Sequence, residues 1–232
     1  MGLRFHYVEN GVFESGAGNA NPIEAKRIAT AILEHVQQNP ELSLGVATFS
    51  VSQRKAIQDE LEVLRRLNPQ YEDFFNSHPG EPFFIKNLEN IQGDERDVIM
   101  ISVGYARNKQ GYLAMRFGPL GSQGGERRLN VLISRAKRRC EVFASITDED
   151  IDLERAKGVG VIAFKLFLQY ARTGRLSMSK VSGRPMDSVF EEQVASALQN
   201  RGYQVHPQVG IAGFFVSAAK STYLPSLYCA TF

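Results

Sequence analysis

Apolar side chains recur at helical spacing between residues 21 and 38, and this pattern predicts an α-helix. Asn21 is placed to cap the start of that helix, and Pro22 suits its first turn. An apolar run at residues 44–49 predicts a buried strand, and helical spacing returns over residues 50–67. A strand that leads directly into a helix is typical of α/β proteins.

The same alternation continues further along the chain. Two apolar runs predict strands at residues 83–85 and 98–103, and a glycine-rich stretch predicts a loop at residues 106–125. A predicted helix over residues 126–136 then leads into a predicted strand over residues 140–145. This alternation predicts a parallel sheet covered by helices on both faces, with ligands at the carboxyl ends of the strands.

The domain boundary is expected after a helix over residues 159–171. We therefore place a first α/β domain at residues 1–172. Residues 173–187 contain glycine, serine and proline and are predicted to be a linker. Residues 188–232 are predicted to form a small α+β fragment that begins with an amphipathic helix over residues 189–201.

Composition narrows the class of protein. No apolar run is long enough to span a bilayer and the start lacks a signal-peptide pattern, so we expect a cytoplasmic protein with no membrane partner. Cys140 and Cys229 lack the spacing of metal ligands, and no metal site is predicted. Although the net charge is only +2, basic residues crowd residues 127–139. Such a cluster fits a phosphate-binding surface or a solvated helix face.

Three segments carry the candidate chemistry, namely TFSVSQ at residues 48–53, NLENIQGDERDVI at residues 87–99 and GGERRLNVLISRAK at residues 124–137. In this order they resemble the late motifs of superfamily 1 helicases related to the nonsense-mediated-decay helicase, the last two being motifs V and VI. The segment NPIEA at residues 21–25 resembles the one that opens the second motor domain there. The resemblance covers residues 1–172 and implies a RecA-like second motor domain.

The turn that contains Gly93 and Glu95 is the first candidate for ligand binding. Glycine lets the backbone approach a ligand closely, and a nearby carboxylate can accept hydrogen bonds from a ribose hydroxyl or hold a basic side chain. The resemblance implies that both residues face the nucleotide. On the residues alone, a tight turn with a solvated acid is the alternative.

Arg135 is the candidate catalytic residue. The resemblance implies that the arginine of a Thr-Arg-Ala core in motif VI reaches the γ-phosphate of ATP, and here the core is Ser134-Arg135-Ala136. A guanidinium can bind phosphate oxygens through two hydrogen bonds and stabilise charge that develops during phosphoryl transfer. Ser134 keeps the hydroxyl of the core, and we expect it to contact nucleic acid.

Three further residues have weaker claims. Arg128 lies two helical turns before Arg135 and is expected to assist at the nucleotide or to form a surface ion pair with Glu126 or Asp94. Gln53 occupies a place where the family often has a glutamine and is a candidate for nucleotide binding, yet a capping box with the serine at position 50 is the favoured alternative.

Asn87 stands where relatives often carry a threonine that touches the nucleic-acid backbone. An asparagine can make a similar contact. The partners implied by the resemblance are therefore single-stranded DNA or RNA.

The sequence contains no GxxxxGK[ST] motif, so the loop that would cradle the phosphates of ATP is not in it. We expect ATP and Mg²⁺ to be shared with a first motor domain that carries this P-loop, and the chain alone to be inactive.

The tail suggests one alternative. Residues 190–194 and 202–210 resemble the start of restriction-endonuclease-like domains, with Glu191 as a candidate metal ligand. Ser217 stands where relatives have an aspartate, and the rest of the metal-binding hairpin is not recognised. A metal-dependent endonuclease is thus one alternative function, and a non-catalytic nucleic-acid-binding module is another.

Overall fold

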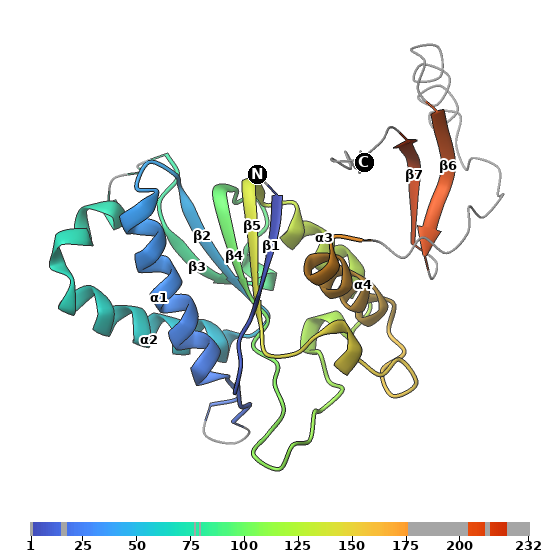
Figure 1. Ribbon diagram of the computed structural model, residues 1–232, viewed down its shortest axis with the longest axis horizontal. Helices are drawn as coiled ribbons and strands as arrows, with labels where there is room; N and C mark the ends of the chain where they lie inside the picture. The colour runs from blue at the N-terminus through green and yellow to red at the C-terminus, as the bar shows by residue number, and fades with distance from the viewer. Residues whose placement is uncertain are drawn as a thin grey trace. The chain divides into compact units, whose positions relative to one another are not determined.

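A computed structural model describes residues 2–14, 18–76, 78, 80–175, 204–211 and 214–221 (Figure 1). The chain divides after Gly174 into two units. In the second unit, β6 (Gln204–Ile211) and β7 (Phe214–Ser221) form an antiparallel pair. The predicted helix over residues 189–201 and Glu191 lie outside the described residues.

The first unit is built on a parallel sheet of five strands in the order β1-β5-β4-β2-β3. The strands are β1 (Gly2–Tyr7), β2 (Leu44–Thr48), β3 (Phe84–Asn87), β4 (Arg96–Ser102) and β5 (Ala136–Ala144). Thr48 pairs with both Asn87 and Ser102, so these three residues mark the carboxyl edge of the sheet. Arg96 and Ala136 pair at the amino edge.

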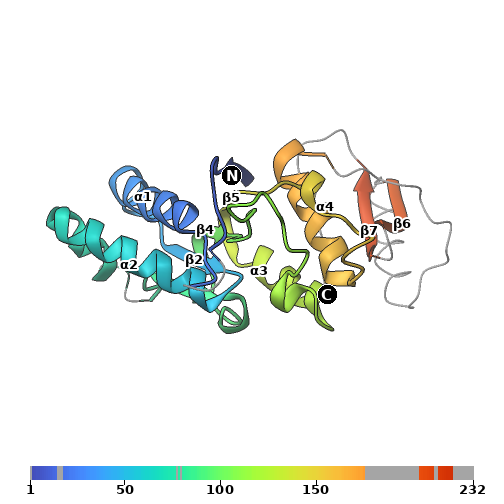
Figure 2. The same cartoon turned by 90° about the horizontal axis from the view of Figure 1, so that it is seen from below.

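Helices cover both faces of the sheet (Figures 1 and 2). One face carries α1 (Pro22–Gln38), α2 (Val51–Leu67) and the 3-10 helix η1 (Pro69–Asn76), and the other carries α3 (Gly125–Ile133) and α4 (Val159–Thr173). Short 3-10 helices lie in the connections, namely η2 (Leu88–Asn90), η3 (Gly118–Leu120) and η4 (Asp148–Asp150). The predicted α/β architecture is confirmed. No described helix is long and apolar enough to cross a membrane.

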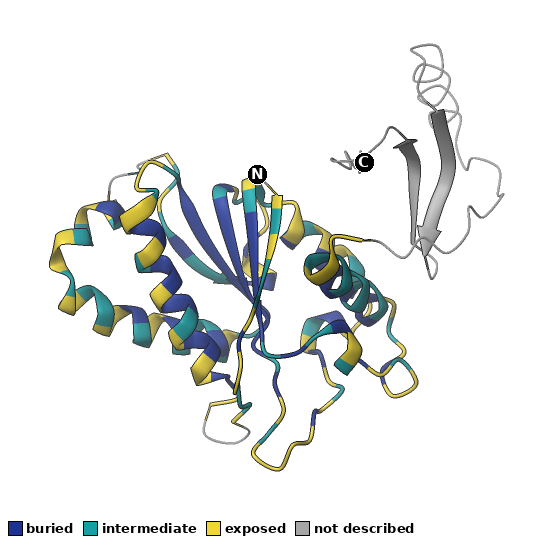
Figure 3. Ribbon diagram, viewed as in Figure 1, coloured by how far each residue is buried: buried dark blue, intermediate teal, exposed yellow. Residues whose placement is uncertain are grey.

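The central strands are buried (Figure 3). They carry apolar side chains on both sides because each side faces a helical layer. In β4, Val98 and Met100 pack toward α1 and α2, whereas Ile99 and Ile101 pack toward α3 and α4. All four side chains are buried. On the second face, α3 and α4 come close together, since an added Cβ at Gly125 or Gly160 would collide with the backbone around the Leu120 carbonyl.

Local signals account for several element boundaries. The Asn21 side chain accepts a hydrogen bond of 3.2 Å from the Glu24 amide, which confirms the predicted N-cap. The helix predicted to reach position 136 ends at Ile133 instead, and β5 begins at Ala136 rather than at Cys140. The reason is that Ala136 pairs with Arg96, so the residues from position 136 onward are part of the sheet and not of the helix.

Candidate functional site

The segments around Glu95 and Arg135 meet at the amino edge of the sheet. The Arg96 amide donates a hydrogen bond of 3.1 Å to the Arg135 carbonyl, and Arg96 pairs with Ala136 in the ladder between β4 and β5. These candidates therefore lie at the edge opposite to the carboxyl ends, at which ligands are expected, because both precede their strands. Two stretches that are some forty positions apart in the sequence thus become neighbours.

A β-bulge lies beside this junction. Arg96 pairs with Ala136 but Val98 pairs with Arg139, so β5 carries one extra residue in this interval. Bulges bend a strand and redirect its side chains. Lys137 contacts Glu81 and approaches Glu95 to 3.7 Å, while Arg138 lies 3.1 Å from Asp97. Two residues of the basic cluster, Lys137 and Arg138, are therefore paired with acids from other segments.

The Arg135 side chain is half-buried and folds back on the end of α3. Its Nε donates to the Val131 carbonyl at 2.9 Å, and its Nη2 donates to the Ser134 hydroxyl at 3.0 Å. The Ser134 hydroxyl itself donates to the same Val131 carbonyl at 3.0 Å. Among the described residues, no carboxylate forms an ion pair with Arg135. Its charge is therefore balanced only by neutral acceptors and the carbonyl end of the helix.

The turn before β4 has a backbone conformation that favours glycine. Gly93 has a φ of +88°, and an added Cβ would meet no atom within 4 Å. The turn is closed by a hydrogen bond of 3.1 Å from the Asp94 amide to the Ile91 carbonyl. The Glu95 side chain is 60% exposed, while Asp94 pairs with Lys86 at 2.6 Å. There is open space above Gly93 and a largely free carboxylate at Glu95.

Arg128 is held within its own part of the fold. Its Nη1 contacts the Pro119 carbonyl, the Ser122 hydroxyl and the Gln123 carbonyl at 3.2, 3.2 and 3.0 Å. Neither of the expected ion pairs forms, because Glu126 lies near Arg127 and Asp94 binds Lys86. In this conformation Arg128 stabilises the turn that precedes α3.

Gln53 lies at the opposite, carboxyl edge and is 1% exposed. The backbone amide of Gln53 donates to the Ser50 hydroxyl at 3.1 Å, and this bond is half of the predicted capping box. The reciprocal half is absent, because the Gln53 side chain binds the backbone of Asn21 at 2.8 and 3.2 Å and the Ser102 hydroxyl at 3.1 Å. The side chain joins α1, α2 and β4.

Asn87 ends β3 at the carboxyl edge and is 5% exposed. Its Oδ1 is buried without a hydrogen-bond partner, and so is the Nε of Arg54 in the first turn of α2. No other partner of the Arg54 guanidinium is seen in the described part of the chain. Sequence analysis did not single out Arg54, and its place directly after Gln53 was the available signal.

Glu24 is a second residue that sequence analysis did not single out, although it lies in the NPIEA segment. It is fully buried and accepts hydrogen bonds from the Ser102 hydroxyl at 2.6 Å and from the Gly104 amide at 2.7 Å. Burial raises the pKa of its carboxyl to about 7, and these hydrogen bonds oppose the shift. The predicted residues thus occupy two edges, with Gly93, Glu95, Ser134 and Arg135 at one and Gln53 and Asn87 at the other.

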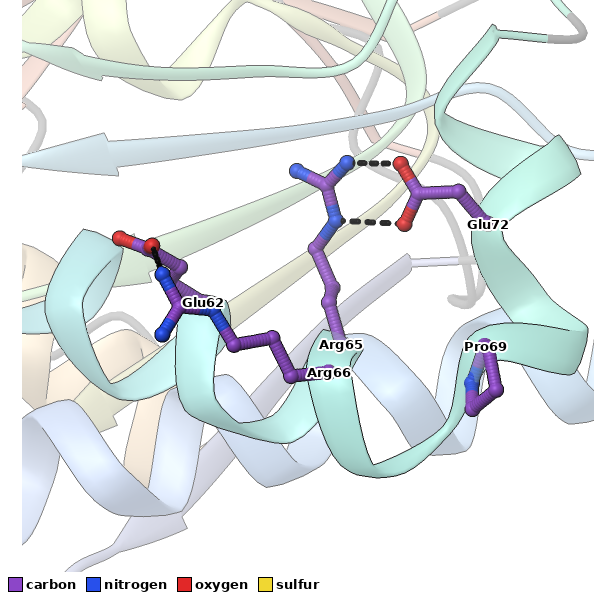
Figure 4. A pocket seen from close by; sticks show the side chains of 5 residues that line it. All are labelled: Glu62, Arg65, Arg66, Pro69 and Glu72. Atoms are coloured by element: carbon purple, nitrogen blue, oxygen red, sulfur yellow. Dashed lines mark hydrogen bonds and ion pairs between the residues drawn. The ribbon is translucent and has the colours of Figure 1, made fainter.

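A hollow at the end of α2 and the start of η1 contains none of the predicted site residues (Figure 4). Its charged groups satisfy one another, since Arg65 binds Glu72 through two nitrogens and Arg66 binds Glu62. Pro69 completes the lining. This surface therefore offers no free charge to a ligand.

Residues 4–147, more than half of the chain, match the family described as AAA domain. The chain belongs to the AAA domain family. Its parallel sheet with helices on both faces is the RecA-like α/β arrangement, and the matched region is helicase-like. Sequence similarity to two curated proteins also indicates that this region is helicase-like.

Two curated relatives are described as uncharacterized ATP-dependent helicases. The one from Mycoplasma pneumoniae is 37% identical over 172 residues, and the one from Mycoplasma genitalium is 35% identical over 170 residues. Each match covers 71% of this AAA domain chain but only 14% of the relative. The chain therefore spans about one seventh of the length of the relatives it matches.

Proposed function

We propose that this AAA domain is the second motor domain of a superfamily 1 ATP-dependent helicase and supplies Arg135 to ATP held by another motor domain. The observation that carries the proposal is the junction of β4 and β5, where the Arg96 amide binds the Arg135 carbonyl. This junction brings the Gly93–Glu95 turn beside an arginine that has no described carboxylate partner. An anion-binding group next to an open glycine turn suits a polyphosphate.

In this proposal Arg135 exchanges its present acceptors for phosphate. Its contacts are with one carbonyl and one hydroxyl, both neutral. Charge-assisted hydrogen bonds to phosphate oxygens are stronger than bonds to neutral acceptors, so a γ-phosphate draws the guanidinium off the end of α3. Arg135 then stabilises the charge of the transferring phosphoryl group. Ser134 is released by the same movement and becomes able to bind a second ligand.

Gly93 and Glu95 hold the rest of the nucleotide in this proposal. The backbone of Gly93 approaches the ligand through open space, and the exposed Glu95 carboxylate accepts hydrogen bonds from the ribose hydroxyls. The P-loop and the groups that hold Mg²⁺ come from the other motor domain, since this sequence has no GxxxxGK[ST] motif. Arg128 contributes through the turn before α3 rather than by touching phosphate, which revises its expected role.

The carboxyl edge is the proposed surface for single-stranded DNA or RNA. Asn87 has an unpaired buried oxygen that can accept from a hydroxyl, and its amide can donate to a phosphate. Arg54 supplies a positive charge after the neighbouring strand β2. Gln53 acts here as a structural support for α1 and β4, since its side-chain atoms are already bonded.

Two observations favour the motor over the alternatives. The strands β6 and β7 contain no aspartate or glutamate, so they give no support to a metal-dependent nuclease. In the basic cluster, Lys137, Arg138 and Arg139 pair with acids of this chain, which weakens the case for a purely electrostatic binding module.

ATP hydrolysis by the purified chain tests the proposal. We expect no turnover, with or without single-stranded DNA or RNA, because the phosphate-binding loop is not in this sequence. Arg135→Ala serves as the control protein in the same assay. Turnover by the chain that disappears in Arg135→Ala would mean a complete nucleotide site within it and would contradict the proposal.

A further inference from the structure

Arg96 is a buried cation without a buried anion. Only 6% of the residue is exposed, and none of the described carboxylates forms an ion pair with it. Its Nε and Nη2 donate to the Pro82 carbonyl at 2.9 and 2.6 Å, and its Nη1 donates to the Glu95 carbonyl at 2.6 Å. The guanidinium also lies 4.7 Å from the centre of the Phe84 ring. Carbonyl dipoles and one aromatic face thus contact the guanidinium directly, while the Glu81 carboxylate interacts with it only through its charge.

The backbone of the same residue reaches the other candidate segment. The Arg96 amide donates to the Arg135 carbonyl at 3.1 Å, beside the bulge that admits an extra residue into β5. Arg96 therefore touches the carbonyl of Glu95 through its side chain and the carbonyl of Arg135 through its backbone.

Burying a guanidinium without a directly bonded carboxylate is costly, so its retention calls for a specific geometric role. Three segments converge on this one side chain or its amide, namely the residues before β3, the Gly93–Glu95 turn and the end of α3. A lysine would keep the charge but could not hold Pro82 and Glu95 together, because its ammonium lacks the planar fork.

We infer that Arg96 is a positioning residue, which fixes the Glu95 turn relative to Arg135 and so sets the geometry of the nucleotide site. This inference rests on the proposed function of Arg135. Arg96 itself touches neither nucleotide nor metal. It acts by limiting the movement of two segments whose side chains must reach the same ligand. Small displacements of such groups lower the reaction rate strongly.

The test is a double-mutant cycle on ATP hydrolysis by the complete helicase that contains this domain. Arg96→Lys alone is expected to lower kcat by about tenfold or more while the KM for ATP changes less. In an Arg135→Lys background, Arg96→Lys is expected to have little further effect in single-turnover assays, because Arg96 acts through Arg135. Equal effects of Arg96→Lys in both backgrounds would overturn the inference.

Arg172→Lys is the matched control, since Arg172 binds Asp148 at 2.8 Å and has no contact with either segment. It is expected to lower stability without a change in kcat of the folded protein. If Arg96→Lys does not fold, Phe84→Leu removes the ring beneath the guanidinium and leaves the fork in place. Phe84→Leu should show the same non-additivity with Arg135→Lys, and strict additivity would again overturn the inference. Unchanged turnover in Arg135→Lys alone would instead refute the proposed function.

Discussion

The amide of Gly104 donates a hydrogen bond of 2.7 Å to the carboxyl group of Glu24, which no solvent reaches. This contact fixes the second residue of the loop from β4 to α3 against the first turn of α1. The Ser102 hydroxyl donates to the same oxygen at 2.6 Å. The described partners of Glu24 include no lysine or arginine, so only neutral donors and the N-terminus of α1 stabilise its charge.

Because the pKa of the Glu24 carboxyl is raised, we predict that the stability of the fold decreases as the pH rises toward neutrality. Its pKa is about 7 in the folded protein against 4.5 ordinarily, so between these values the folded state holds a proton that the unfolded state has lost. The free energy of unfolding should therefore decrease by roughly 3 kcal/mol between pH 4.5 and above pH 7. Urea denaturation at pH 5 and pH 8 measures this change. Glu24→Gln should abolish most of the difference, and an unchanged pH dependence in that variant would refute the assignment.

Gln53→Ala should destabilise the fold. It removes the acceptor of the buried Asn21 amide and the donor to Ser102, and we expect a loss of about 3 kcal/mol in the free energy of unfolding. Gln58→Ala, at an exposed position of the same helix, is the control and should change stability by less than about 0.5 kcal/mol. Equal denaturation midpoints for the two variants would show that the Gln53 contacts do not stabilise the domain.

Gly93→Ala should destabilise the fold through strain in the backbone alone. The φ of +88° disfavours any residue with a Cβ, yet the space that the Cβ would enter is open. We expect a loss of about 1 kcal/mol, measured by chemical denaturation. Gly80→Ala is the comparison, because Gly80 also faces open space but has no positive φ. A loss of the same size in both variants would mean that the backbone of the turn is not what requires glycine.

Local patterns predicted much of the fold. The cap at Asn21, the apolar run of β2 and the helical spacing of α2 each depend on neighbouring residues, and the structure confirms them. The strand β1 was not predicted, since it lies at the edge of the sheet and its residues are largely exposed or half-buried. Such a strand lacks the apolar run that identifies a buried one.

The arrangement of the site was harder to predict. Motif order indicated that Glu95 and Arg135 belong to one site, but not that both precede their strands, because this depends on the pairing of Arg96 with Ala136. The basic cluster looked like a phosphate-binding surface because its acidic partners Glu81 and Asp97 are remote in sequence. The unpaired atoms of Arg54 and Asn87 likewise follow from packing rather than from a motif.

We propose that Arg135 acts on a nucleotide held by another domain of the complete helicase. The decisive measurement is steady-state ATP hydrolysis by that protein with Arg135→Ala, alongside nucleotide affinity from equilibrium titration. We predict that kcat falls by about a thousandfold while nucleotide affinity changes little, because the guanidinium stabilises the transition state more than the bound ground state. Normal turnover in the Arg135→Ala protein would contradict the account.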